Sequence, residues 1–413
     1  MYYESTAAAY KQHGIADRPI ALSRDNGPNW KTNDPEDQVL SGAGAPAHHR
    51  YPVWWTGDGV SLMASVESMV QEAVHDFRAF VHSDCGGHGD RNKKSCPATV
   101  TGAPPEDKAC SSPNDQALLR WTAHCVLGTI VRFHQGDHRF WLRPNETQNV
   151  ARKYLTMRHS LAPSLIAAGR LLQHQGFPLT ARCDLIWPEY KEASDPTQYI
   201  HLNATLVAPL DVEPVDKITN TRSVWLPPGQ WVDGWSGKEM QGPQTITATQ
   251  PADKIPLWHK RGALLVTDHS DTLRLEGQDW TELTIEAFPS SSPSHATRTL
   301  YMQEKMLHDA PVLVSLSTLT NGTLAVEASA SPVRTWVVRV HLRPGQRLST
   351  DRLEHHTGVQ MSSVQHLLPD CARAYFPYEG LGSPPPCHAG PIAEVKVQTS
   401  GQKWCFKAEV ADV

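Results

Sequence analysis

YPVWWTGDGVSLMASVESMVQEAVHDFRAFVHSDCGGH, residues 51–88, has the pattern of a strand, a loop, a helix and a second strand. The first strand ends before two glycines, which permit a sharp turn and leave Asp58 at the strand tip. The apolar residues that follow change to helical spacing and form one stripe: Leu62, Val66, Met69, Val70 and Val74. The second strand leads to Asp84. Because a strand–helix–strand unit of a parallel barrel sends both strand ends to the same rim, we expect both aspartates at one edge.

Segments on either side of this stretch extend the pattern. RPIALSR is predicted to be a strand that ends in Arg24. DQALLRWTAHCVLGTIVRFH begins at Asp115, is apolar over most of its length and ends with Arg132 and His134. Polar stretches interrupt the pattern and are predicted to be surface insertions: residues 25–50 and 89–114.

The second half of the chain changes from helical to β-rich patterns. ARKYLTMRHSLAPSLIAAGRLLQHQG, residues 151–176, is predicted to be a long helix that Pro163 kinks and Gly176 ends. After about residue 195, short β-rich runs alternate with Pro/Gly turns. This pattern is typical of strands joined by tight turns.

A set of motifs in a fixed order makes the chain resemble glycoside hydrolase family 31, the retaining α-glucosidases and α-xylosidases. The motifs are LSR, WTGD, SDCGGH, RFH, TLVAP, LPPGQW and IPLxxxxG. Each motif alone is weak, whereas their combination over residues 1–265 is highly specific. The resemblance implies a fold that is α/β plus all-β, in which part of a (β/α)8 TIM barrel precedes two β-sandwiches.

The domains that the resemblance implies follow the order of the motifs. It places the C-terminal half of the catalytic barrel in residues 1–195, including the two insertions, with residues 177–183 as the last barrel strand. It places a proximal β-sandwich in residues 196–266. A distal β-sandwich in residues 267–413 fits the remaining alternating runs, whose sequence is less specific.

Retaining cleavage of a glycosidic bond needs two carboxyl groups about 5 Å apart, one as nucleophile and one as general acid/base. The resemblance implies that Asp58 is the general acid/base, and an apolar neighbour such as Trp55 would raise its pKa by desolvation. The alternative for Asp58 is a turn-capping role. The resemblance also implies a set of substrate-binding side chains: Arg24, Trp55, Asp84, Arg132 and His134. The alternatives for this set are barrel packing, an Asx turn, surface ion pairs and a buried core histidine.

The nucleophilic aspartate that the resemblance implies has no counterpart in these 413 residues. In the family it lies in a motif like DGxWxDMNE upstream of the LSR segment, and no D-x-N-E occurs here. Three alternatives follow: a fragment of a longer hydrolase, a chain that pairs with a separate N-terminal half, or an inactive carbohydrate-binding or scaffold relative. The hypothesised reaction is hydrolysis of an oligosaccharide or α-glucoside with a terminal α-linked sugar, with glucose favoured over xylose. Transfer to a second sugar instead of water stays open.

Composition limits the remaining functions. The net charge of −5 points to neither nucleic acid nor an acidic membrane surface as a partner. No apolar run approaches the roughly 20 residues of a membrane span, and the first residues lack the pattern of a signal peptide. We expect no cofactor and no metal, because Gly-rich phosphate loops and the GxSxG, CxxC and H-E-x-x-H motifs are absent.

Cysteines and N-glycosylation sequons slightly favour a secretory-pathway, lysosome-like or extracellular location. The sequons begin at Asn145, Asn203 and Asn321. Cysteines within polar or Pro-rich loops are candidate disulfide pairs: Cys96 with Cys110, and Cys371 with Cys387. Cys85 and Cys125 have apolar surroundings and are expected to be buried thiols.

Overall fold

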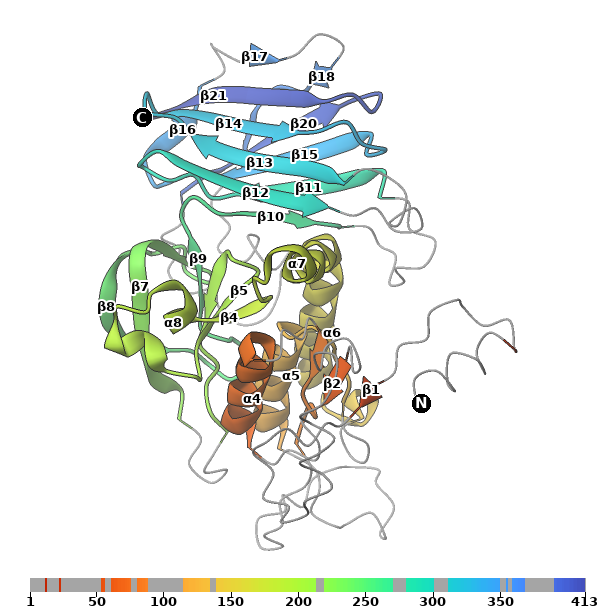
Figure 1. Cartoon of the computed structure of the whole chain (residues 1–413), viewed down its shortest axis with the longest axis vertical. Helices are drawn as coiled ribbons and strands as arrows, with labels where there is room; N and C mark the ends of the chain where they lie inside the picture. Colours follow the sequence, from red (N-terminus) through yellow and green to blue (C-terminus); the bar gives the residue numbers. More distant parts are fainter. Residues whose placement is uncertain are drawn as a thin grey trace, which may run out of the picture.

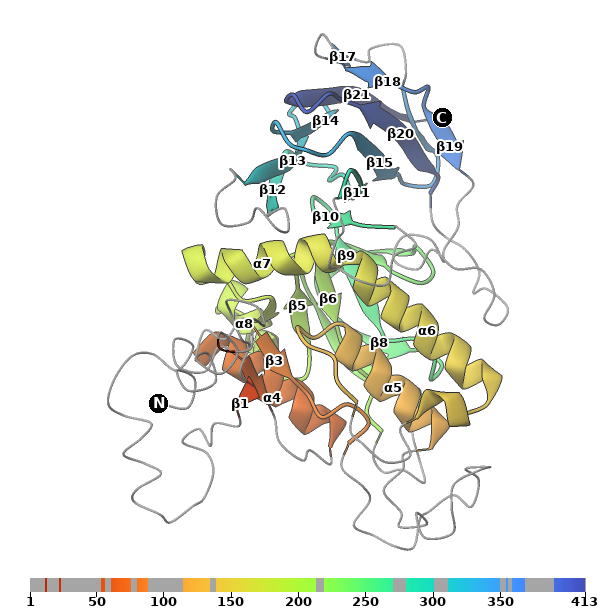
Figure 2. The same cartoon turned by 90° about the vertical axis from the view of Figure 1, so that its right-hand side faces the viewer.

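The computed structural model describes these residues of the chain: 12, 22–23, 53–55, 61–75, 80–87, 114–133, 139–212, 219–269, 280–300, 311–349, 354–355, 359–367 and 390–412. Helices with a small parallel sheet and an antiparallel sheet lie in the lower part of Figure 1, and a β-sandwich lies above them. Figure 2 shows α7 running across the junction between the two parts. In the described ranges, no helix is both long and apolar enough to cross a membrane.

The N-terminal part is a parallel α/β unit. Its elements are β1 (Leu22–Ser23), β2 (Val53–Trp55), α4 (Leu62–His75), β3 (Phe80–His82) and α5 (Asp115–Val126). The strands lie in the order β1–β2–β3, and both pairs are parallel. Parallel bridges from His82 to Ile130 and from Cys85 to Phe133 add a further strand position. Neighbouring parallel strands joined by helices are the repeating unit of a (β/α)8 barrel, so the predicted partial barrel is confirmed.

The helices of this unit begin and pack as their sequences indicate. The predicted stripe of α4 is buried wherever its side chains are described, at Leu62, Val66, Met69 and Val70. Asn114 caps α5, since its side-chain oxygen accepts a hydrogen bond of 2.8 Å from the backbone N–H of Ala117.

The predicted long helix is two helices, α6 (Asn145–Ser160) and α7 (Ala162–Gln175), which meet at Leu161. Pro163 lies in the first turn of α7, where its missing backbone N–H leaves no helical hydrogen bond unmade. Gly176 follows α7 with φ of 71°, a left-handed conformation that favours glycine. The predicted helix end at Gly176 is therefore confirmed, whereas the prediction of one continuous helix that Pro163 kinks is wrong, because the chain breaks into two helices at Leu161.

A six-stranded antiparallel sheet follows, in the order β4–β5–β6–β9–β7–β8. Its strands are β4 (Thr180–Arg182), β5 (Tyr199–His201), β6 (Thr205–Val207), β7 (Thr221–Asp233), β8 (Glu239–Thr249) and β9 (Leu257–Lys260). The prediction that residues 177–183 form a barrel strand is wrong, because β4 pairs with β5 in antiparallel register, Thr180 opposite His201. A short strand carries no signal that selects a parallel or an antiparallel neighbour, so tertiary packing decided this pairing.

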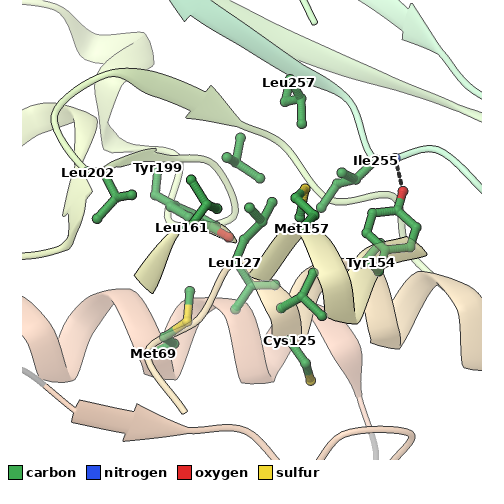
Figure 3. Close-up of a cluster of buried hydrophobic side chains, with 14 of the residues drawn as sticks. Met69, Cys125, Leu127, Tyr154, Met157, Leu161, Tyr199, Leu202, Ile255 and Leu257 are labelled. Atoms are coloured by element: carbon green, nitrogen blue, oxygen red, sulfur yellow. Dashed lines mark hydrogen bonds between the residues drawn. The ribbon is translucent and has the colours of Figure 1, made fainter. Parts of the chain in front are cut away.

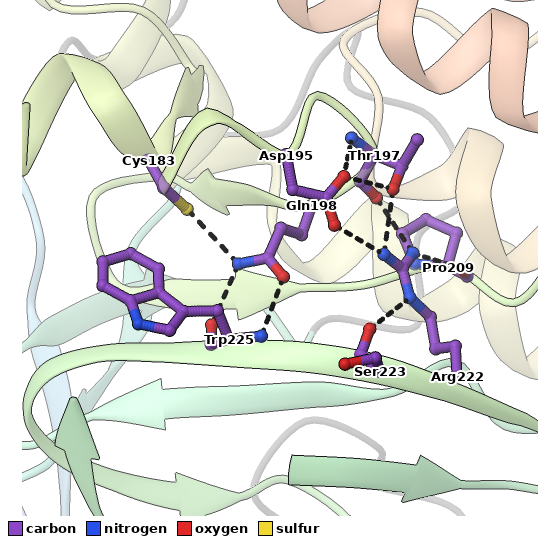
Figure 4. A network of polar contacts seen from close by, with 8 residues as sticks. All are labelled: Cys183, Asp195, Thr197, Gln198, Pro209, Arg222, Ser223 and Trp225. Atoms are coloured by element: carbon purple, nitrogen blue, oxygen red, sulfur yellow. Dashed lines mark hydrogen bonds and ion pairs between the residues drawn. The ribbon is translucent and has the colours of Figure 1, made fainter. Parts of the chain in front are cut away.

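Connections in this region contain short helices: η2 (Phe140–Leu142), α8 (Cys183–Ile186) and η3 (Lys191–Ser194). Side chains hold the connection before β5 to strand β7, as Figure 4 shows. Arg222 donates hydrogen bonds to Asp195 Oδ2 at 3.2 Å and to Thr197 Oγ1 at 2.9 Å. Buried Gln198 donates to the carbonyl oxygen of Trp225 at 2.9 Å and accepts from its N–H at 3.1 Å. These bonds satisfy polar groups that would otherwise be costly to bury.

The C-terminal part is a sandwich of two six-stranded sheets. The first contains β10 (Leu264–Thr267), β11 (Glu282–Ala287), β15 (Thr335–His341), β18 (Gln360–Met361), β19 (Gln365–Leu367) and β20 (Ile392–Gln398). The second contains β12 (Ser294–Leu300), β13 (Val312–Thr318), β14 (Thr323–Ala328), β16 (Gln346–Leu348), β17 (Glu354–His355) and β21 (Trp404–Asp412). Trp336 of β15 and Trp404 of β21 belong to one buried cluster, with ring centroids 5.9 Å apart. The predicted fold class of a partial barrel followed by β-sheet domains is therefore confirmed, although the described proximal part is one six-stranded sheet where a sandwich was expected. The domain boundaries stay a prediction.

The parallel unit and the antiparallel sheet share one hydrophobic core, part of which Figure 3 shows. Met69 of α4, Leu127 after α5 and Met157 of α6 are buried in it. Tyr199 of β5 and Leu257 of β9 belong to the same cluster. Since burial in a common core removes apolar surface of both units from water, each unit stabilises the other.

Aromatic rings join the antiparallel sheet to the sandwich. The ring of Phe288, which follows β11, stacks on His259 of β9 with centroids 4.7 Å apart. Its centroid lies 4.4 Å from that of His341 of β15. Helix α7 also contacts β10 and β12 of the sandwich. The two parts therefore meet through a packed interface.

Candidate active site

Polar and aromatic residues occur where neighbouring parallel strands end. Trp55 is the last residue of β2 and lies opposite His82, the last residue of β3. The parallel bridges from His82 to Ile130 and from Cys85 to Phe133 advance by the same number of residues on both segments. Asp84 therefore lies opposite Arg132.

The guanidinium of Arg132 lies near three side chains at these strand ends: Asp84, Trp55 and His82. Its Nη1 lies 3.8 Å from Asp84 Oδ1, the distance of an ion pair rather than of a hydrogen bond. Its Cζ lies 5.6 Å from the centroid of the Trp55 ring, within the range of a cation–π contact. The Asp84 side chain is fully buried, whereas the Arg132 side chain is 46% exposed. The group therefore presents a guanidinium to solvent above a buried carboxylate.

His82 is the second contact of this guanidinium, with Nε2 3.2 Å from Arg132 Nη1. Burial lowers the pKa of His82 to about 4, and the charge of Arg132 adds to this effect, while a hydrogen bond involving the Ser83 backbone opposes it. The imidazole is therefore neutral at neutral pH. A neutral imidazole that accepts at Nε2 carries its proton on Nδ1.

A disulfide between Cys85 and Cys125 joins the end of β3 to α5. The prediction that these cysteines are buried thiols is wrong, although both are buried. Their apolar surroundings are shared by thiols and disulfides, and only the fold brings their Cα atoms to 6.1 Å, a distance that a disulfide spans. The other predicted cysteine pairs lie outside the described residues: Cys96 with Cys110, and Cys371 with Cys387.

Further hydrogen bonds hold the chain on both sides of Asp84. Ser83 Oγ lies 3.3 Å from Nε2 of His124, whose pKa burial lowers to about 4. The N–H of Gly87 donates to the carbonyl oxygen of Asp84 at 2.9 Å. The N–H of Cys85 donates to the carbonyl oxygen of Arg132 at 3.3 Å. The backbone that carries the buried carboxylate is therefore held by side-chain and main-chain bonds as well as by the disulfide.

The structure brings together Trp55, Asp84 and Arg132 from the predicted set. Arg24, Asp58 and His134 lie outside the described residues. His82 is not among the predicted site residues, and no cluster of metal-ligating side chains occurs in the part of the chain that is described. The spacing between His82 and Asp84 could have indicated its place at this site. Residues two apart on a strand share a face, and His82 precedes Asp84 by two positions.

Comparison with known families shows to which family the chain belongs. The family model described as "Glycosyl hydrolases family 31 TIM-barrel domain" matches residues 6–168. The one described as "Glycosyl hydrolase family 31 C-terminal domain" matches residues 181–265. The chain belongs to glycoside hydrolase family 31. Members of family 31 hydrolyse or transfer α-glycosides.

Curated relatives of this family 31 chain are distant. It is 24% identical over 205 residues to a 1,6-alpha-glucosyltransferase of Sporosarcina globispora, a match that covers 46% of this chain and 15% of the relative. It is 21% identical over 241 residues to alpha-glucosidase 2 of Bacillus thermoamyloliquefaciens, a match that covers 55% of this chain and 27% of the relative. The chain thus matches 15% of the first relative's length and 27% of the second's.

Solved structures share the fold. A dextranase of Flavobacterium johnsoniae, solved with isomaltotriose, has a TM-score of 0.67 at 16% identity, over 99% of this chain and 48% of that chain. The cycloalternan-forming enzyme of Listeria monocytogenes, solved with a pentasaccharide substrate, has a TM-score of 0.68 at 18% identity, over 100% of this chain and 35% of that chain. At these identities the likeness shows the fold alone.

Proposed function

We propose that this chain carries the acid/base side of a retaining family 31 active site that acts on terminal α-linked sugars. The observation that supports this proposal most is the meeting of Trp55, Asp84 and Arg132 from neighbouring parallel strands. In parallel barrels, the residues that follow the strands build the active site at one rim. Asp58 follows the last residue of β2 by three positions and is the general acid/base of the proposal.

Each described side chain has a role that its chemistry suits. The carboxylate of Asp84 accepts hydrogen bonds from sugar hydroxyls, and the half-exposed guanidinium of Arg132 donates to them. The indole of Trp55 forms an apolar wall for the sugar ring. Arg24 and His134 complete the proposed set as further hydroxyl-binding groups.

The proposed reaction has two steps. In the first, a nucleophilic carboxylate attacks the anomeric carbon while the carboxyl of Asp58 gives its proton to the departing glycosidic oxygen. In the second, the Asp58 carboxylate takes a proton from the incoming water, whose oxygen displaces the nucleophile from the anomeric carbon. A sugar hydroxyl in place of water gives transfer instead of hydrolysis.

The second carboxylate of this mechanism belongs, in the proposal, to a segment outside these 413 residues, because no D-x-N-E motif occurs within them. Glucose is the proposed terminal sugar. The names of the relatives include both a glucosyltransferase and an alpha-glucosidase, so transfer is retained as the second candidate reaction.

Replacement of Asp58 by asparagine tests the proposal in the full protein. We expect the hydrolysis rate of an aryl α-glucoside to fall about 100- to 10,000-fold, because the proton donor is lost. Binding of isomaltotriose, measured by calorimetry, should persist. Asp184→Asn is the matched control, since Asp184 pairs with Arg182 in another part of the fold.

The result also separates the proposal from a carbohydrate-binding or scaffold role. A full protein that binds isomaltotriose but hydrolyses and transfers no α-glucoside, with or without Asp58, would contradict the catalytic proposal and support the binding role. Hydrolysis that survives Asp58→Asn unchanged would contradict the assigned acid/base.

A further inference from the structure

A cavity of about 430 Å³ lies where α7, the β5–β6 turn, the connection from β9 to β10 and β12 meet. This volume is in the range of small-molecule sites, which is about 300–1,000 Å³. The cavity shares no lining residue with the candidate active site around Asp84. Its walls come from the antiparallel sheet, from α7 and from the sandwich, so a ligand bound there would contact all of them.

The cavity wall is cationic. Lys260, Arg261 and Arg298 line it, and no aspartate or glutamate occurs among its described lining residues. Arg261 forms an ion pair with Glu239, which offsets its charge. Lys260 and Arg298 are the other two cationic residues of the wall.

Arg298 is held as a fixed part of the wall. Arg298 is only 7% exposed. Its Nη2 donates hydrogen bonds to the carbonyl oxygens of Leu202 at 2.7 Å and Leu264 at 3.0 Å. These bonds orient the guanidinium before any ligand arrives, which lowers the entropic cost of binding.

Lys260 is the more adaptable cation. Its Nζ lies 5.6 Å from the centroid of the Trp187 ring, and no ion pair to Lys260 is found in the described part of the chain. Burial lowers its pKa because the ammonium loses hydration. An anion in the cavity would offset this loss.

Ser294 and Gly262 also line the cavity beside these cations. Ser294 Oγ is buried and makes no hydrogen bond within the described residues. Gly262 has φ of 87°, and a Cβ atom added to it would lie 3.4 Å from Ser294 Oγ. A buried hydroxyl without a partner is costly, so a ligand group that bonds to Ser294 Oγ would remove this cost.

We propose that this cavity binds a small molecule carrying an oxyanion, namely a phosphate, sulfate or carboxylate group, between Lys260 and Arg298. The oxyanion accepts hydrogen bonds from both cations, and Ser294 Oγ and Thr297 bind the polar remainder of the ligand. Charge-assisted hydrogen bonds to phosphate or carboxylate are stronger than bonds between neutral groups, so the cavity selects the anion over a neutral sugar of similar size.

Calorimetric titration of the full chain tests this inference, with inorganic phosphate, glucose 6-phosphate and glucose as probes at constant ionic strength. We expect saturable binding of at least one anionic probe and no comparable binding by glucose at the cavity. Tighter binding of glucose 6-phosphate than of inorganic phosphate would assign the site to an organic phosphate, and the reverse order to the free ion.

Charge variants locate the binding. Lys260→Gln and Thr297→Glu should each weaken anion binding at least about tenfold, the loss expected for one charge-assisted bond. Lys396→Gln should leave it unchanged, because Lys396 is an exposed lysine on β20 that does not line the cavity. Thermal unfolding of each variant shows whether it is folded.

Several results would overturn the inference. They are the absence of saturable anion binding, equal affinity for glucose and glucose 6-phosphate, and an equal loss in Lys260→Gln and Lys396→Gln. If Lys260→Gln unfolds, Thr297→Glu decides by itself, since it adds a negative charge and removes none of the cations.

Discussion

Arg132 Nη1 lies 3.2 Å from Nε2 of His82, a histidine whose pKa is lowered to about 4. The contact joins the end of β3 to the next parallel segment, residues 130–133. Trp55, at the end of β2, lies opposite His82. A neutral imidazole here accepts a hydrogen bond from the guanidinium, which also lies 3.8 Å from Asp84 Oδ1. The electrostatics of the candidate site therefore centre on Arg132.

Replacing Arg132 by glutamine should raise the pKa of His82. The positive charge beside the ring is removed, so protonation becomes easier, but burial is the larger cause of the low pKa and stays. We expect a pKa above about 4 and still below the ordinary 6.5, measured by NMR titration of the imidazole. His124 is an internal control, because burial alone lowers its pKa and it should not respond. An unchanged His82 pKa would show that Arg132 does not act on it.

Breaking the Cys85–Cys125 disulfide should destabilise the parallel unit. The bond closes a loop with a sequence separation of 40, and a disulfide of this kind contributes about 2–4 kcal/mol. Urea unfolding followed by tryptophan fluorescence should show a lower midpoint after reduction of the wild type. The Cys85→Ala/Cys125→Ala protein should start from the lower midpoint and be insensitive to reductant. Equal midpoints for oxidised and reduced wild type would refute the prediction.

Replacing Glu286 by glutamine should destabilise the sandwich at neutral pH. Glu286 is buried, and it lies 2.7 Å from His341 Nε2 and 3.3 Å from Arg339 Nη1. Glutamine removes the carboxylate charge beside His341, whereas Arg339 keeps its ion pair with Glu394 at 2.9 Å, so we expect a loss of about 1–3 kcal/mol in the free energy of unfolding. Glu282→Gln is the matched control, because Glu282 is an exposed residue of the same strand.

The buried carboxylate of Glu286 also predicts that the free energy of unfolding depends on pH. Burial acts to raise the pKa of Glu286, but hydrogen bonds from His269 and His341, with the charges of His341 and Arg339, outweigh it and hold the pKa well below the ordinary 4.5. Its stabilisation is thus present above the unfolded-state pKa and is lost as pH falls toward the folded-state pKa. The free energy of unfolding of the wild type should fall below about pH 4.5, and that of Glu286→Gln should fall less. Parallel pH curves for the two proteins would contradict this assignment.

Replacing Tyr154 by phenylalanine should weaken the shared core. The Tyr154 hydroxyl donates to the carbonyl oxygen of Asp253 at 2.9 Å and accepts from the N–H of Ile255 at 3.1 Å, and Figure 3 shows the latter bond. Loss of both bonds leaves buried backbone groups unpaired, at about 1–3 kcal/mol in the free energy of unfolding. Tyr190→Phe, at a half-buried tyrosine whose hydroxyl makes no hydrogen bond within the described ranges, should cost less in the same urea titration.

Local patterns predicted much of this architecture. The helical stripe of α4 and the end of α7 at Gly176 follow from residues within a few positions of each feature. Motif order predicted the family, and the resemblance to that family implied that Asp84 and Arg132 belong to one substrate-binding set. These features were accessible because side-chain spacing and backbone preference act locally.

The errors concern partners that are distant in sequence. Cys85 and Cys125 have the same apolar character whether they are thiols or a disulfide, so their pairing depended on the distance between β3 and α5. β4 has the composition of a strand in either orientation, and its antiparallel neighbour was set by packing against β5. His82 gained its role only because the register places it beside Arg132.

By itself, the sequence determined the family, the order of the α/β and β-rich parts, and the residue types at the strand ends, because spacing, turn residues and motif order are written along the chain. Only the tertiary structure decided which strands pair, which cysteines join, and that Lys260 and Arg298 line one cavity. The physical reason is that contacts between distant segments depend on the packing of whole elements, in which apolar burial sets the positions and the polar groups must find partners.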